Sequence, residues 1–249
     1  MIREGRSVMK RYTGVIFDMD GVLFDTERVY QESWHEIADG MGITLGDGWV
    51  EAISGTNGEV MCRAIEKFYR VPDGAEIMNV CKGLVRDKLS RHVPVKAGVR
   101  EMLDFFRERN VRIALASSST RAQILSNLAL TRLGAAFDAI VSGEEVTVGK
   151  PDPEIFLRAA RALQCPPAEC LVFEDSKSGV RAGHAAGCDT VMVPDLIAPS
   201  PDIVPLCFRI YGDMNAALAD MRELECVSKC REMQFRADLA AFQGDFPQA

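Results

Sequence analysis

One stretch decides the fold: Gly14-Val15-Ile16-Phe17-Asp18-Met19-Asp20-Gly21-Val22-Leu23-Phe24-Asp25-Thr26-Glu27. The apolar run from Val15 to Phe17 is typical of a buried parallel strand. Asp18 and Asp20 follow it two residues apart, so their side chains leave the strand end on the same side. Gly21 then allows a tight turn. Two carboxylates at one strand end repel each other unless a cation or a shared proton relieves them, and Mg²⁺ prefers such oxygen ligands.

An Asp-x-Asp pair is also common in solvated acidic loops, so this motif needs partners elsewhere in the chain. The 249 residues suffice for one large core, or for a core with a smaller second domain. With 47% hydrophobic and 26% charged residues, the composition is typical of a soluble globular protein. A net charge of −7 without a basic run argues against nucleic acid and anionic membranes as partners.

The chain shows neither a signal-peptide pattern nor an apolar run of membrane-spanning length. Its eight cysteines lie mostly in apolar surroundings without a repeated spacing, which favours reduced thiols over disulfides or a zinc site. We therefore predict a cytoplasmic location.

Residues 28–94 predict an inserted all-α cap. Apolar residues at helix spacing predict helices over 28–41, 58–69 and 75–92, which end near Gly42, Pro72 and Pro94. Residues 53–57 between the first two helices form a turn-like stretch that includes Gly55.

From residue 95 onward, predicted helices and strands alternate strictly. Helices are expected over 99–109, 120–133, 152–163 and 178–186, and strands over 111–116, 139–141, 170–173 and 190–193. This alternation predicts a doubly wound parallel sheet with helices on both faces, which binds ligands beyond the carboxyl ends of its strands. We expect residues 12–27 and 95–225 to form this α/β core, and we assign no role to residues 1–11 or 226–249.

Polar residues follow three further strands. Ser117-Ser118-Ser119-Thr120 can supply hydroxyl and backbone N–H groups to an anion, although capping of the next helix is the simpler role for one of them. Lys150 stands beside prolines that restrict the backbone and would neutralise charge on a nucleophile and a phosphate. Glu174-Asp175-Ser176 adds two carboxylates, with a helix cap as the alternative for Asp175 or Ser176.

This set, in this order, resembles the haloacid dehalogenase superfamily. The matching residues are Asp18-x-Asp20-Gly21, Ser117, Lys150 and Glu174-Asp175, and the helical insertion is similar to the cap of the phosphatase and phosphoglucomutase branch. The resemblance covers roughly residues 13–192 and implies a Rossmann-like core with that cap. The four motifs are specific as a set, although each alone is weak.

The resemblance implies a role for each motif residue. Asp18 would be the nucleophile that forms an aspartyl-phosphate, and Asp20 would act as acid and then as base. Lys150 would steady Asp18, and Ser117, with backbone N–H groups near Ser118, would bind the phosphoryl oxygens. The ligands of Mg²⁺ would be Asp18, the carbonyl of Asp20, Asp175, and Glu174 directly or through water.

The leading hypothesis is a Mg²⁺-dependent phosphatase for a small phosphorylated metabolite, in particular a sugar phosphate, working as a monomer or weak homo-oligomer. Gly21, Ser118, Gly55 and Lys82 are the predicted substrate-facing residues, and a solvated helix lysine is the alternative for Lys82. A β-phosphoglucomutase-like isomerase is the rival enzyme. That branch usually carries an arginine after the cap glycine and a histidine after the first motif, where this chain has Thr56-Asn57 and Arg28-Val29-Tyr30. A non-catalytic sensor of phosphorylated ligands is the alternative outside enzymes.

Overall fold

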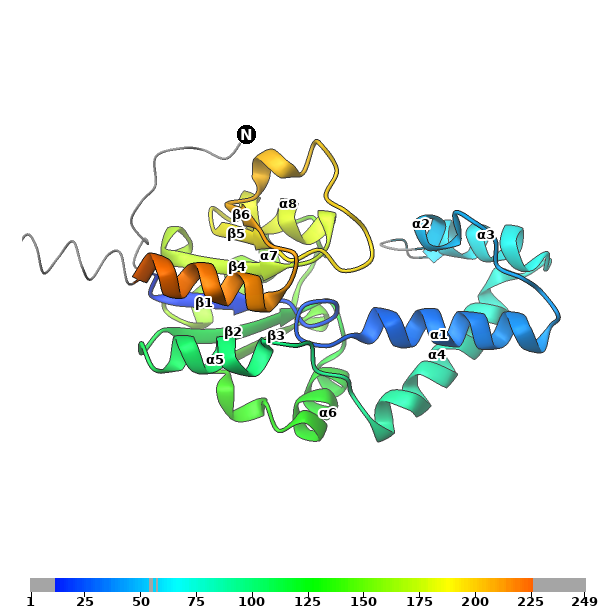
Figure 1. Ribbon diagram of the computed structural model, residues 1–249, viewed down its shortest axis with the longest axis horizontal. Helices are drawn as coiled ribbons and strands as arrows, with labels where there is room; N and C mark the ends of the chain where they lie inside the picture. Colours follow the sequence, from blue (N-terminus) through cyan, green and yellow to red (C-terminus); the bar gives the residue numbers. More distant parts are fainter. Residues whose placement is uncertain (1–11, 54–55, 57, 226–249) are drawn as a thin grey trace, which may run out of the picture.

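A six-stranded parallel sheet forms the centre of the computed structural model, which describes residues 12–53, 56 and 58–225 (Figure 1). The strand order is β3-β2-β1-β4-β5-β6. The strands are β1 (Gly14–Phe17), β2 (Arg112–Ser117), β3 (Ala139–Ser142), β4 (Cys170–Glu174), β5 (Asp189–Met192) and β6 (Arg209–Ile210). The predicted parallel sheet is therefore confirmed.

Strand β1 lies between β2 and β4, and its register positions the site. Phe17 is paired with Leu115 of β2 on one side and with Phe173 of β4 on the other. The residues that follow these strands therefore meet at one edge of the sheet. The chain order changes direction across the sheet around β1, which is where such sheets bind ligands.

Helices cover both faces of the sheet. Successive side chains of β1 point to opposite faces, and those on each face are apolar, so each face needs a layer of helices to bury it. Val15 and Phe17 face a core that includes α5 and the helix over 214–225, whereas Ile16 faces a core formed with α7 and α8. These helices and α6 have the bounds α5 (Val99–Arg107), α6 (Arg121–Thr131), α7 (Glu154–Ala162) and α8 (Lys177–Ala185).

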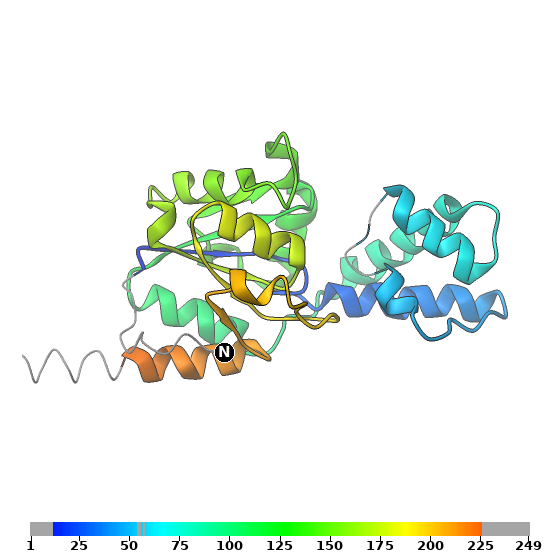
Figure 2. The same ribbon diagram turned by 90° about the horizontal axis from the view of Figure 1, so that it is seen from above.

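Four helices between β1 and α5 extend beyond the sheet on the side where β1 ends (Figures 1 and 2). They are α1 (Thr26–Gly40), α2 (Trp49–Ile53), α3 (Gly58–Tyr69) and α4 (Gly74–Arg91). Trp34, Trp49 and Tyr69 pack edge to face, with ring centroids 5.6–6.3 Å apart. The Tyr69 hydroxyl donates to the Trp34 carbonyl at 2.5 Å, so this aromatic cluster fixes α1 against α3.

Two linkers join these helices to the sheet, and they are hydrogen-bonded to each other. Phe24 and Val95 form an antiparallel bridge. The Asp25 N–H donates to the Pro94 carbonyl, and the Lys96 N–H donates to the Leu23 carbonyl, each at 2.9 Å. The cap is therefore attached through a short paired ribbon.

The expected helices and strands are present with end shifts of a few residues, but several short elements were not predicted. These are α2, β6 and the 3₁₀ helices Gly134–Ala136, Gly143–Glu145, Pro167–Glu169 and Val204–Leu206. Each of these is five residues or shorter, which is too short for a repeating apolar pattern to reveal it. The helix over 214–225 was not predicted either.

Within the described part of the chain, Cys62, Cys81, Cys165, Cys170 and Cys207 are free thiols, as predicted, and Cys81, Cys165 and Cys170 are buried. Cys226 and Cys230 lie outside the described residues. Across residues 12–53, 56 and 58–225, no helix is both long enough and apolar enough to span a bilayer.

Replacing Phe173 by alanine tests the central packing. Its ring stacks on Phe17, with centroids 4.8 Å apart and planes 7° from parallel, and the edge of Phe106 packs on it. We expect Phe173→Ala to lower the free energy of unfolding by about 3–5 kcal/mol in urea titrations. The control Leu157→Ala removes a side chain on α7 that is 40% exposed and should change it by less than about 0.5 kcal/mol. Equal losses in the two variants would contradict this account of the core.

Candidate active site at the carboxyl ends of the strands

The loop after β1 holds two carboxylates in different surroundings. The Asp18 side chain is buried, and its backbone N–H donates to the Phe173 carbonyl at 3.0 Å, which ties the start of the loop to β4. Asp20 accepts hydrogen bonds on both carboxylate oxygens. Thr26 donates to one at 2.7 Å, and Ser119 donates to the other at 2.9 Å.

Lys150 lies between the acids that follow β1 and end β4. Its ammonium contacts an Asp18 carboxylate oxygen at 2.5 Å and a Glu174 oxygen at 2.6 Å. The Lys150 side chain is 6% exposed, so the ion pairs are shielded from water. It is supplied by the segment between β3 and α7, as the sequence predicts, and the Lys150–Pro151 peptide bond is cis.

Glu174 is engaged through both of its carboxylate oxygens. One accepts from Lys150, and the other accepts from the backbone N–H groups of Asp175 and Ser176, each at 2.9 Å. The Ser176 hydroxyl also bonds this second oxygen and caps α8 by accepting from the Gly179 N–H. The predicted capping role therefore falls to Ser176, and Glu174 orients the ammonium of Lys150.

Asp175 lies against the loop after β1. A Cβ on Gly21 would overlap an Asp175 carboxylate oxygen, and Gly21 has a φ of +80°, which disfavours other residues. Glycine at this position therefore brings the carboxylates of Asp18 and Asp175, from different strands, to the same end of the sheet.

The three serines at the end of β2 differ in their burial and in their hydrogen bonds. Ser117 is buried, and its hydroxyl accepts the Ser119 N–H at 3.1 Å, which shapes the loop. Ser118 is exposed, and Thr120 caps α6 by accepting the Gln123 N–H. Ser119, which the motif analysis did not single out, is the serine that contacts Asp20.

Burial dominates the electrostatics of this end of the sheet. It raises the pKa of Asp18 to about 8, against the lowering effect of Lys150 and with further raising by Glu174 and Asp20. It raises the pKa of Asp20 as well, against its bonds to Thr26 and Ser119. Burial, followed by the charges of Glu174 and Asp18, raises the pKa of Asp175 well above its ordinary value. When these acids are ionised, they carry more negative charge than Lys150 offsets, and their burial makes that state unfavourable without a further cation.

This excess charge fits a hard divalent cation. Among residues 12–53, 56 and 58–225, no three His, Cys, Asp or Glu side chains form a ready-made metal cage. Mg²⁺ does not require one, because it usually keeps several waters and binds one or two carboxylates together with substrate phosphate. Asp18 and Asp175 are the carboxylates with capacity for it, since Glu174 is already committed to Lys150 and backbone N–H groups.

A cavity of about 280 Å³ separates Asp20 from the cap helices. Its lining includes Ser119 from the core and Lys82, an exposed residue of α4. The predicted substrate-facing Lys82 thus shares a cavity with Asp20, whereas Gly55 lies outside the described residues.

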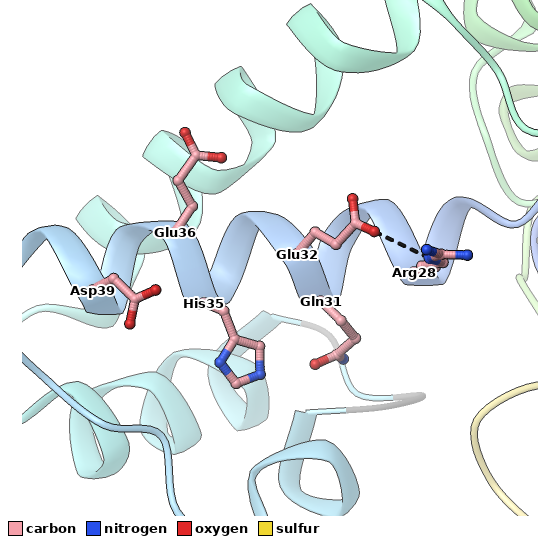
Figure 3. Close-up of a pocket in the computed structure, with 6 residues that line it drawn as sticks. All are labelled: Arg28, Gln31, Glu32, His35, Glu36 and Asp39. Atoms are coloured by element: carbon pink, nitrogen blue, oxygen red, sulfur yellow. Dashed lines mark hydrogen bonds and ion pairs between the residues drawn. The ribbon is translucent and has the colours of Figure 1, made fainter.

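A larger hollow of about 510 Å³ lies along α1 and carries none of the strand-end residues (Figure 3). Its six lining side chains all belong to α1, and Arg28 and Glu32 pair across one helical turn at 3.0 Å. The side chains of a single exposed helix face do not converge on one point, whereas the smaller cavity is lined from both the core and the cap. We therefore locate the site at the smaller cavity.

Lys96 and Asp195 also approach the loop after β1, and the motif analysis did not identify them. The Lys96 ammonium donates to the Gly21 carbonyl at 2.7 Å and contacts Asp195 at 2.6 Å. Glu27, close by, has its pKa raised to about 7, mainly by burial and then by Asp20 and Asp195. Asp195 comes three residues after β5, so inspection of the residues beyond that strand would have revealed it.

Comparisons with known proteins identify the family of the chain. A family model described as "Haloacid dehalogenase-like hydrolase" matches residues 15–193. A "Phosphorylated carbohydrates phosphatase" of Thermotoga maritima is 36% identical over 180 residues, which is 71% of this chain and 82% of that protein. A "Beta-phosphoglucomutase" of Bacillus subtilis is 34% identical over 188 residues, 72% of this chain and 82% of that protein.

Solved structures share the fold. A haloacid dehalogenase family hydrolase from Deinococcus radiodurans, with bound phosphate and sodium, superposes with a TM-score of 0.74 at 24% identity. The match covers 86% of this chain and 96% of that one.

Two glycine-to-alanine substitutions test the packing beneath the site. A Cβ on Gly179 in the first turn of α8 would overlap the Glu174 carboxylate, whereas a Cβ on Gly83 in α4 meets open space. We expect Gly179→Ala to lower the free energy of unfolding by about 1–3 kcal/mol. Gly83→Ala should raise it by about 0.5–1 kcal/mol, because alanine restricts the unfolded chain. Chemical denaturation measures both, and stabilisation by Gly179→Ala would contradict the observed position of Glu174.

Proposed function

The chain belongs to the haloacid dehalogenase-like hydrolase family and is a hydrolase of phosphoric monoesters, and we propose that it releases phosphate from a small phosphorylated sugar with the help of Mg²⁺. The observation that carries the proposal is the position of Lys150 between Asp18 and Glu174, with Asp20 on the same loop as Asp18. A relative named for phosphorylated carbohydrates supports the substrate class. Helices α1–α4 act as a cap that covers the site.

In the proposed reaction, an Asp18 carboxylate oxygen attacks phosphorus, and the bond to the sugar oxygen breaks as Asp20 protonates that oxygen. An aspartyl-phosphate and the free sugar result. Asp20 then takes a proton from water, the water oxygen attacks phosphorus, and the bond to Asp18 breaks. The products are inorganic phosphate and the original carboxylate.

The surroundings of each acid suit its proposed role. Lys150 holds Asp18 at one oxygen, which leaves the other for attack. Two hydroxyl donors hold Asp20, and its raised pKa favours a proton that it can give to a leaving group. Ser117 and the backbone near Ser118 bind the phosphoryl oxygens.

Asp18, Asp175 and the backbone carbonyl of Asp20 would hold Mg²⁺, with Glu174 acting through Lys150 and the loop backbone rather than as a direct ligand. When bound, the ion supplies positive charge that lets the carboxylates and the substrate phosphate approach each other.

Phosphate release from a panel of phosphorylated sugars, with Mg²⁺ or with EDTA, tests the proposed function. We expect release by the wild type only with Mg²⁺, and a loss of at least about 10³-fold in Asp18→Asn, because the amide cannot form the covalent intermediate. Asp104→Asn, which makes the same change on the exposed surface of α5, should keep full activity.

Release that Asp18→Asn retains would refute the mechanism. Conversion of a sugar 1-phosphate to its 6-phosphate without release would establish the isomerase instead.

The raised pKa values predict how stability depends on pH in EDTA. A carboxyl whose pKa is higher in the folded than in the unfolded protein stabilises the fold below its unfolded pKa, and this contribution is lost as the pH rises through the folded value. For Asp18 we therefore expect the melting temperature to fall between about pH 4 and pH 8. The pKa of Asp175 is raised in the same direction, so Asp175 adds to this fall.

Asp175→Asn removes one of the excess charges. At pH 8 in EDTA, we expect it to melt at a higher temperature than the wild type and to lose the stabilisation that Mg²⁺ gives the wild type. Asp104→Asn should match the wild type in both respects. Full stabilisation of Asp175→Asn by Mg²⁺ would remove Asp175 from the metal site.

A further inference from the structure

The cavity beside Asp20 has two chemically different sides. The residues that line it from the core are polar: Asp20, Ser119 and Gln123. All its apolar and aromatic lining comes from the cap, and each of the helices α1–α4 contributes: Tyr30, Trp34, Ile53, Met61, Met78 and Leu89. A phosphate held at the strand ends would therefore direct the rest of its substrate toward an apolar surface.

One face of α1 lines the length of this cavity. Glu27, Tyr30, Gln31 and Trp34 stand at helix spacing on that face, and Thr26 at its start is bonded to Asp20. With a rise of 1.5 Å per residue, Trp34 lies roughly 12 Å along the helix from Thr26. The lined space thus continues beyond the first sugar-sized group attached to the phosphate.

The apolar part of the lining suits a flat ring. Tyr30 of α1 contributes an aromatic ring, and the thioethers of Met61 and Met78 come from α3 and α4. Tyr30 and both methionines are half-buried, so the cavity exposes part of their surface. Aromatic faces and methionine sulfur both make favourable contacts with planar π-systems.

The polar groups on the cap side indicate what that ring carries. The side-chain oxygen of Gln31 is buried and accepts no hydrogen bond within the described residues, so a donor on the ring edge would satisfy it. Lys82 is the only cation among the described residues that line the cavity. A second phosphate usually requires a cluster of basic groups, so the lining favours a monophosphate.

We propose that the cavity binds a phosphorylated sugar whose other end carries a flat, uncharged ring with a hydrogen-bond donor, as in a nucleoside 5′-monophosphate. This inference rests on the proposed phosphatase function and narrows its substrate class. The ring lies between Tyr30 of α1 and the methionines of α3 and α4, and the sugar lies nearer to Asp20.

The test compares substrates that differ only in the ring. Phosphate release with Mg²⁺ is measured for uridine and adenosine 5′-monophosphates and for ribose 5-phosphate, which is the same phosphorylated sugar without a base. We expect kcat/KM for at least one nucleotide to exceed that for ribose 5-phosphate by about tenfold or more. In Met78→Gln, a near-isosteric polar replacement, this advantage should shrink through a higher KM for the nucleotide.

Met41→Gln is the matched control, because Met41 is 44% exposed and lies outside the cavity lining. It should behave as the wild type with every substrate. Equal or higher kcat/KM for ribose 5-phosphate would overturn the inference and leave the phosphatase intact. An advantage for nucleotides that Met78→Gln leaves unchanged would overturn the placement of the ring. No release from any of these esters or from p-nitrophenyl phosphate would instead refute the proposed function on which the inference rests.

Discussion

The site depends on one constraint, which is the neutralisation of carboxylates that the sheet brings together out of water. Because Phe17 and Phe173 are paired in register, Asp18 follows β1 directly beside Glu174 at the end of β4. Two buried carboxylates this close would oppose folding without a cation. Lys150 supplies that cation from the segment after β3, with ammonium contacts of 2.5 and 2.6 Å. The pairing of β1 with β4 and the path of the chain after β3 therefore support each other.

The four acids at this edge have the same chemistry but different surroundings. Both carboxylate oxygens of Glu174 accept hydrogen bonds, one from Lys150 and the other from backbone N–H groups, so Glu174 has a structural role. Asp18 has one carboxylate oxygen on Lys150, and Asp20 lies between two hydroxyl donors. Asp175 lies against Gly21, with its pKa raised by burial and then by its acidic neighbours. Such differences allow one group of acids to divide into nucleophile, proton carrier, metal ligand and support.

The sequence reveals those features that depend on local pattern or on strand order. The apolar run before Asp18 and the alternation after residue 95 predict the sheet, and the rule that ligands bind beyond strand ends brings Lys150 and Asp175 to Asp18. Ser119 escaped notice because its contact with Asp20 depends on how the loop after β2 bends around Ser117. The Lys96–Asp195 pair joins residues 99 positions apart, which no local spacing encodes.

The cap is connected to Asp20 by more than chain continuity. Thr26, the first residue of α1, donates to Asp20, so the start of the first cap helix is also a hydrogen-bond partner of the proposed proton carrier. On the returning linker, Lys96 bonds the Gly21 carbonyl in the same loop. A rotation of the cap about its paired linkers would therefore move groups that hold Asp20 and Gly21. Because the cap also lines the cavity, substrate contacts on α1–α4 and the geometry of Asp20 are physically coupled, which is how binding of the remote part of a substrate can assist the reaction at phosphorus.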